Sequence, residues 1–154
     1  MDKRRVSTAL SRLGANPLVR AFHRLGIPFP GTAILETVGR KTGKVRRTPV
    51  TNGLDGDVFW IVAEHGRRAG YVRNLEASPR VRVKAGRRWR AGTATIVPDD
   101  DPRERLRKLS RGPAAASARM VPVMGSDLLS IRIDLDPEPG RAAKAREGEQ
   151  ATAR

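Results

Sequence analysis

TAILETVGRKTGKVRRTPVTNGLDGDVFWIVA, residues 32–63, alternates three runs that favour β-strands with two turns. Gly39 and Gly43 allow a tight bend, and Asp55-Gly56 is a strong hairpin signal. Because Pro49 has no backbone N–H to donate, its strand is predicted to lie at a sheet edge or to carry a bulge. The predicted strands are Thr32 to Val38, Arg46 to Leu54 and Val58 to Ala63.

Further along the chain, the same reasoning predicts three more strands and two short helices. Leu129, Ile131, Ile133 and Leu135 alternate with polar residues, as in a strand with one buried face. The further strands are predicted around 81–83, 88–97 and 128–136, and the helices at about 69–77 and 102–110. Six strands joined mostly by tight turns predict a mainly β protein with helices (α+β), in the form of a small split or closed barrel. The short links disfavour parallel βαβ architecture.

The chain divides into three segments by composition. Residues 1–30 form a basic N-terminal segment, in which an apolar face predicts one or two helices. These helices either pack on the sheet or rest on a membrane surface or an apolar substrate. Residues 31–136 form the predicted barrel and catalytic domain. Residues 137–154 are polar and poor in aromatic side chains, which predicts a disordered basic tail.

The net charge of +15 predicts an anionic partner, which could be nucleic acid, anionic lipid or a phosphorylated cofactor. The chain has no cysteine and only two histidines, so no metal site is expected. No apolar run approaches the roughly 18 residues that a bilayer span needs. We expect a cytoplasmic protein, with peripheral membrane contact through the N-terminal segment as the alternative.

Two segments could carry chemistry. In the basic turn, residues 39–48, backbone N–H groups, the Thr42 hydroxyl and several cations could assemble a phosphate cradle. The alternative is a solvated basic hairpin. In residues 63–75, an apolar strand ends in a glycine-containing loop, and a helix follows with Tyr71 and Asn74 on one face. Such a strand end could bind a planar ring; alternatively, Tyr71 packs on the barrel and Asn74 caps a turn.

No catalytic triad or dinucleotide fingerprint is present in the sequence. His65 could act as an acid, but a single loop histidine is usually only solvated. If the chain is an enzyme, a cofactor must therefore supply the reactivity.

Taken in their order along the chain, these segments resemble the deazaflavin-dependent nitroreductases. These are the actinobacterial split β-barrel reductases and quinone reductases that use coenzyme F-420. The matching runs are LETVGRKTGKVRRTP (35–49) and YVRNLEASPRV (71–81), within a resemblance that covers about residues 17–136. The resemblance implies an FMN-binding-like split barrel. It also implies hydride transfer from the coenzyme to a small apolar or aromatic acceptor of nitroaromatic, quinone or enone type.

The resemblance also implies roles for particular residues. The basic turn would bind the coenzyme phosphate and acidic tail, and the strand-end loop would meet the deazaflavin ring through backbone groups, with Asn74 and Tyr71 beside it. The catalytic candidates are Tyr71, His65 and Thr51. Glu64-His65 replaces the Ser-Lys of the best-known nitroreductases, and Thr51 replaces a frequent tyrosine. The implied coenzyme-binding residues are Arg40, Lys41, Thr42, Gly43, Arg46, Arg47, Thr48, Ala63, Glu64, His65, Gly66, Tyr71 and Asn74.

Two alternatives remain open. A related split barrel could bind FMN or another planar cofactor, in which case colour would copurify with the protein. A non-enzymatic barrel could instead bind nucleic acid. The second alternative is disfavoured because binding of single strands needs aromatic stacking platforms, and the chain has only six aromatic residues.

Overall fold

The computed structural model describes residues 31–109, 111 and 127–140. The helices predicted in residues 1–30, and with them the proposed membrane contact, lie outside the described residues. Residues 112–126 and the tail beyond residue 140 also lie outside them. None of the helices in the described ranges has the length and apolar character of a membrane span.

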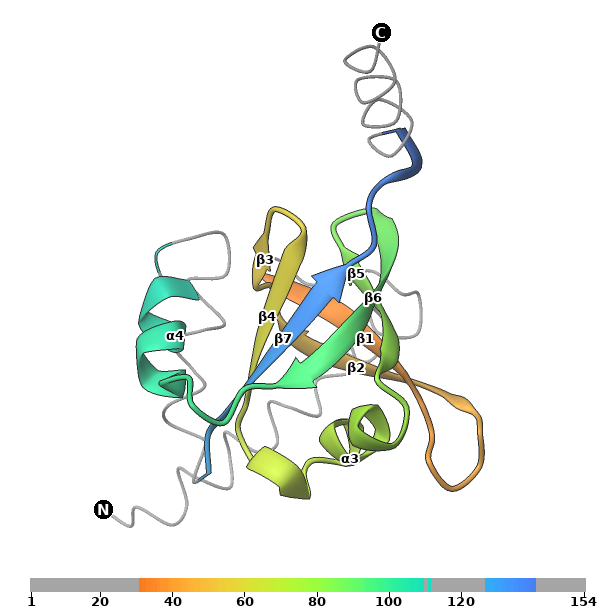
Figure 1. The fold of residues 1–154 in the computed structure, drawn as a ribbon, viewed down its shortest axis with the longest axis horizontal. Coiled ribbons are helices and arrows are strands. Elements are labelled where there is room, and N and C mark those ends of the chain that lie inside the picture. The colour runs from red at the N-terminus through yellow and green to blue at the C-terminus, as the bar shows by residue number, and fades with distance from the viewer. Residues whose placement is uncertain (1–30, 110, 112–126, 141–154) are drawn as a thin grey trace, which may run out of the picture.

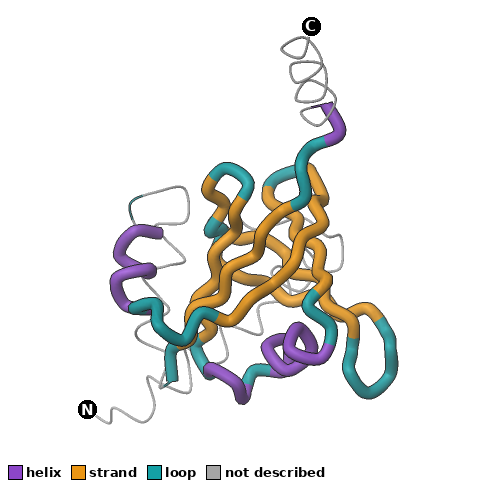
Figure 2. The backbone as a smooth tube through the Cα atoms, viewed as in Figure 1, coloured by secondary structure: helices purple, strands orange, loops and turns teal. Residues whose placement is uncertain are grey.

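The described chain forms one antiparallel sheet of seven strands that curls into a half-barrel (Figures 1 and 2). The strand order is β2-β1-β5-β6-β7-β4-β3. The elements are β1 (Thr32–Val38), β2 (Val45–Thr51), β3 (Leu54–Asp55), β4 (Val58–Ala63), η1 (Gly66–Arg68), α3 (Gly70–Ala77), β5 (Arg80–Ala85), β6 (Arg88–Ile96), α4 (Pro102–Leu109) and β7 (Leu129–Leu135). The mainly β fold predicted from the sequence is confirmed.

The predicted strand Arg46 to Leu54 is divided into two strands. β2 ends at Thr51, and the Trp60 N–H donates to the Gly53 carbonyl at 2.9 Å. A Cβ atom at Gly53 would lie 1.9 Å from the Trp60 carbonyl oxygen, so the two backbones touch there. This close approach separates β2 from the two-residue strand β3 and gives seven strands where about six were expected. Pro49 lies in β2, an edge strand, as predicted.

One apolar core fills the barrel. Phe59, Leu35 and Ile133 are fully buried, and Val72 and Leu75 of α3 close one end of the cluster. Alternation along β7 turns Ile131 and Ile133 inward, as expected for a strand with one buried face.

Helix α4 covers part of the outer face of the sheet. Leu106 packs against Val62 of β4 in a second, smaller apolar cluster. Arg105 reaches back to Asp100 at 2.6 Å, and its guanidinium lies 3.5 Å from the centre of the Trp60 ring. This covering explains why Ser130 is buried although it lies on the polar side of the β7 pattern.

The two ends of the barrel carry different turns. The β1–β2 hairpin (orange) and α3 lie at the lower end in Figure 1. The β3–β4 turn, the β5–β6 turn and the chain that leaves β7 lie at the upper end.

Candidate functional site

The basic turn between β1 and β2 is closed by its own backbone. The Gly39 N–H donates to the Lys44 carbonyl at 2.8 Å, and the Gly43 N–H donates to the Gly39 carbonyl at 2.7 Å. Gly43 has φ +67°, a conformation that other residues seldom adopt. The Thr42 hydroxyl accepts a hydrogen bond from the Lys44 N–H at 3.3 Å. The two glycines thus produce the tight bend predicted from the sequence.

A cavity of about 420 Å³ lies between this turn and the start of α3. Among the described residues, its lining holds four cationic residues and no carboxylate. Lys41 and Arg46 are exposed, and neither forms an ion pair within the described residues. Unpaired cations around one hollow favour a polyanionic ligand. The lining residues are Gly39, Arg40, Lys41, Thr42, Arg46, Arg47, Thr48, Gly70, Tyr71 and Asn74.

Asn74 joins the basic turn to the barrel. Its side-chain oxygen accepts from both the backbone N–H and the Nη1 of Arg40, each at 3.2 Å. Its Nδ2 donates to the Thr37 hydroxyl at 3.2 Å, and only 7% of the residue is exposed. The Asn74 backbone carbonyl also accepts from the Ser78 N–H, where α3 ends. Asn74 borders the cavity, but its amide is engaged by protein groups, which makes it a positioning residue for the turn.

Arg47 differs from the other cations of the turn. Its Nε lies 3.1 Å from a carboxylate oxygen of Glu36, which also binds Arg82 at 3.2 Å. The Arg47 and Arg82 guanidiniums both lie over the Trp89 ring, at 5.3 and 4.9 Å from its centre. Arg47 borders the cavity, yet its charge is already paired. It is therefore a weaker anion ligand than Lys41 or Arg46.

A second cavity, of about 220 Å³, adjoins the first because both are bordered by Thr48 and Tyr71. The walls of this second cavity are partly apolar, and Glu64 is the only carboxylate that the described part of the chain contributes to them. All three predicted catalytic candidates, Tyr71, His65 and Thr51, border it. Its lining residues are Thr48, Pro49, Val50, Thr51, Ile61, Val62, Glu64, His65, Ala69 and Tyr71.

The loop after β4 borders the second cavity through Glu64 and His65. Gly66 has φ +50°, and a Cβ atom there would lie 2.6 Å from the Asp127 carboxylate. His65 pairs with Asp127 in an isolated β-bridge. Ala63 and Gly66, both predicted to contact the coenzyme, are buried and border neither cavity. In this structure they support the loop.

Tyr71 lies where the two cavities meet. Burial raises the pKa of its hydroxyl well above the usual value, and the nearby Glu64 carboxylate raises it further. The phenol is therefore neutral across the physiological range and offers a hydrogen-bond donor rather than a charge.

Several residues of the site were not singled out from the sequence. The Thr37 hydroxyl accepts the hydrogen bond from Asn74. Gly70, at the start of α3, borders the first cavity, and Ile61 and Val62 form apolar wall of the second. Alternation along β4 would have indicated only part of this wall, because Ile61 and Val62 point to opposite faces. Within the described ranges, no group of three or more His, Cys, Asp or Glu could hold a metal ion.

Solved structures with the same architecture define the class of fold. An F-420-H2 dependent reductase superposes with a TM-score of 0.51 at 23% identity, covering 69% of this chain and 94% of that chain. A heme storage protein from Vibrio cholerae superposes with a TM-score of 0.53 at 14% identity, covering 80% and 91% respectively. At these identities the likeness shows the fold alone, which is the FMN-binding-like split barrel.

The sequence identifies the family. Residues 6–135 match the model of the F-420H(2)-dependent quinone reductases, and the chain belongs to this family. The F-420H(2)-dependent quinone reductase of Mycobacterium tuberculosis (strain H37Rv) is 38% identical over 85 residues. That match covers 51% of this chain and 57% of the relative, so it spans little more than half the length of either protein.

The family implies coenzyme F-420, and the residues of the site fit this group. A hollow with unpaired cations and no carboxylate suits a phosphate and an acidic tail. The adjoining, partly apolar cavity suits a planar ring.

We predict that Asn74→Ala lowers the free energy of unfolding by about 1–3 kcal/mol, because it leaves the Arg40 and Thr37 groups without their partner. Urea unfolding measures this change, and the Arg40 amide should exchange its hydrogen faster in the variant. Glu76→Ala, on the exposed face of the same helix, removes only a surface ion pair with Arg67 and serves as the control. Equal effects of the two substitutions would contradict the positioning role of Asn74.

Tyr71 is the only tyrosine in the sequence, so its ionisation can be followed alone by ultraviolet absorbance. We predict that the folded protein shows no phenolate at pH values near the ordinary pKa of about 10, whereas the urea-unfolded chain ionises there. Circular dichroism at each pH shows whether the fold persists. A midpoint near 10 in the folded protein would show that Tyr71 is not buried as described.

Proposed function

We propose that this chain is an oxidoreductase that binds coenzyme F-420 in the paired cavities and reduces a small organic acceptor of quinone type. The observation that carries the proposal is the carboxylate-free cationic hollow directly beside a partly apolar cavity. When bound, the reduced coenzyme supplies a hydride. The quinone class is favoured by the activity in the name of the Mycobacterium tuberculosis relative. Nitroaromatic and enone acceptors share the electron-poor character that hydride transfer requires.

The basic turn performs the binding step. Lys41 and Arg46, which are exposed at the cavity, would pair with the phosphate and the acidic tail. Arg40 would act from a fixed position, since Asn74 holds both its backbone and its side chain. Thr48 and Tyr71, where the second cavity begins, would then border the ring system.

The second cavity performs the orienting step. Thr48, Pro49 and Ile61 would exclude water from one side of the acceptor, so that donor and acceptor carbons can approach. The neutral Tyr71 hydroxyl would donate a hydrogen bond to the acceptor oxygen on which negative charge develops. His65 is exposed at the rim of this cavity.

A fluorescence titration with coenzyme F-420 tests the proposal. We predict saturable binding below about 50 µM, and at least a tenfold weaker affinity for Lys41→Glu/Arg46→Glu, with the difference shrinking as salt is added. The control pair Arg103→Glu/Arg111→Glu changes the net charge equally at exposed positions outside the cavity and should alter affinity by less than about twofold.

Two results would count against the proposal. Absence of binding by the unaltered chain would exclude the coenzyme. Equal loss in both charge-reversal pairs would show that general attraction to a basic protein, rather than the turn, accounts for the binding. Copurification of a yellow flavin would favour the FMN alternative.

A further inference from the structure

A separate pair of cavities lies at the opposite end of the barrel from the basic turn. There the β3–β4 turn, the β5–β6 turn and the chain that leaves β7 come together (Figure 1, top). The larger cavity measures about 660 Å³ and the smaller about 300 Å³, and they share Arg88, Arg90 and Glu138. Neither cavity shares a residue with the two cavities of the candidate coenzyme site.

The smaller cavity has an apolar floor where the core reaches the end of the barrel. Five of its nine lining residues are apolar: Leu54, Phe59, Val83, Ala85 and Leu135. Phe59 is fully buried, whereas Leu54 is 44% exposed, one of the few large apolar side chains open to solvent. An apolar hollow of this size can take a short alkyl chain or a single ring.

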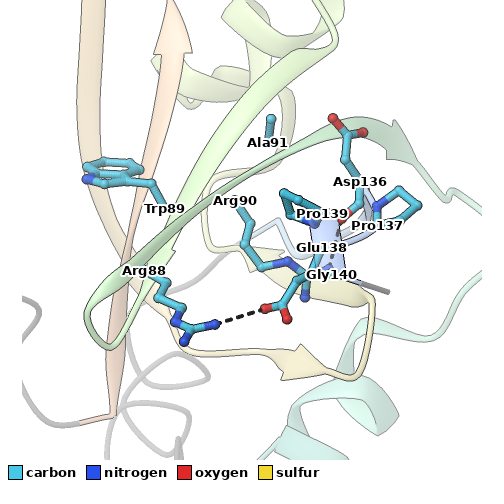
Figure 3. A pocket seen from close by; sticks show the side chains of 9 residues that line it. All are labelled: Arg88, Trp89, Arg90, Ala91, Asp136, Pro137, Glu138, Pro139 and Gly140. Atoms are coloured by element: carbon cyan, nitrogen blue, oxygen red, sulfur yellow. Dashed lines mark hydrogen bonds and ion pairs between the residues drawn. The ribbon is translucent and has the colours of Figure 1, made fainter. Parts of the chain in front are cut away.

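The rim of the smaller cavity is cationic. Arg87, Arg88 and Arg90 border it, and within the described ranges Glu138 is its only carboxylate. Arg88 is 79% exposed and meets Glu138 at 3.6 Å, a long ion pair at the surface (Figure 3). Arg87 is exposed and makes no ion pair within the described residues. Two arginines are therefore available to an incoming anion.

Arg90 differs from Arg87 and Arg88, because it forms hydrogen bonds to several segments of the cavity wall. Its side chain is only 16% exposed; it binds Asp57 at 2.8 Å, the Gly56 carbonyl at 3.2 Å and the Asp136 carbonyl at 3.0 Å. The Leu135 N–H donates to the Asp57 carbonyl at 2.8 Å. These bonds join β6, the β3–β4 turn and the end of β7. The cavity is thus preformed, which lowers the entropic cost of binding.

The larger cavity lacks this combination. Arg88 and Arg90 are matched there by Asp136 and Glu138, so its charges balance (Figure 3). Net positive charge and an apolar floor occur together only in the smaller of these two cavities.

We infer that the smaller cavity binds an amphipathic carboxylate, with its apolar part against Leu54 and Ala85 and its carboxylate between Arg87 and Arg88. Arg88 exchanges its long contact with Glu138 for the ligand. The inference goes beyond the proposed reductase activity, and the ligand would bind whether or not a coenzyme occupies the other end of the barrel.

Decanoate, kept below its micelle-forming concentration, is a suitable probe, and amide chemical shifts of the whole chain report where it binds. We expect saturable shifts around Leu54, Val83 and Arg88 and none around Thr48 or Tyr71. Decyltrimethylammonium has the same tail with the opposite charge and should bind at least tenfold more weakly. Arg87→Gln/Arg88→Gln should weaken decanoate binding at least tenfold, whereas Arg103→Gln/Arg111→Gln should change it less than twofold.

Three results would overturn the inference. Equal weakening by both arginine pairs would mean that decanoate follows the general positive charge of the protein. Shifts centred on Tyr71 would place the probe in the candidate coenzyme site. Absence of saturable shifts at the barrel end would mean that the cavity does not take an amphipathic anion. All four arginines are exposed or paired only at the surface, so the variants should fold, and the spread of their amide spectra verifies this.

Discussion

The hydrogen bonds of the Asn74 side chain are the constraint on which the candidate site depends. One buried amide accepts two bonds from Arg40 and donates one to Thr37, so it fixes the basic turn to both α3 and β1. A hairpin tip with several exposed cations would otherwise be free to swing away from the barrel. With the turn fixed, its cations border the first cavity, which meets the second at Thr48 and Tyr71, and the end of β4 borders the second.

The chain has a net charge of +15, and the structure shows which of its described cations are paired with carboxylates and which are not. Arg82 and Arg47 share the Glu36 carboxylate, Arg105 pairs with Asp100, and Arg90 pairs with Asp57. These pairs tie strands and helices together. In the part of the chain that the structure describes, Lys41 and Arg46 of the basic turn form no ion pair, and at the opposite rim Arg87 forms none while Arg88 forms only a long one with Glu138. High net charge alone would have suggested polyanion binding over the whole surface.

Much of the fold could be predicted from the sequence, because the strands have clear period-two patterns and strong turn signals. β1 and β4 begin and end where they were predicted, and Asp55-Gly56 forms the expected hairpin turn. The break after Thr51 was missed because it arises from the contact of Gly53 with Trp60, a packing event without a local signal.

The candidate site was only partly predictable. The basic turn, Tyr71, His65 and Thr51 were predicted from residue type and from the resemblance. In the structure they border two adjoining cavities. Alternation along β2 could have separated Arg47 from Arg46, since neighbouring residues of a strand face opposite sides. The positioning role of Asn74 could not be read from the sequence, because it depends on partners 34 and 37 positions away.

The central claim is that the basic turn binds the anionic part of the coenzyme while the ring extends toward Tyr71. A crystal structure of the protein soaked with coenzyme F-420 tests it most directly. The account predicts density for the phosphate within hydrogen-bond distance of Lys41, Thr42 or Arg46, with the ring beside Thr48 and Tyr71. A bound coenzyme that leaves this turn empty, with its rings in another part of the barrel, would contradict the account.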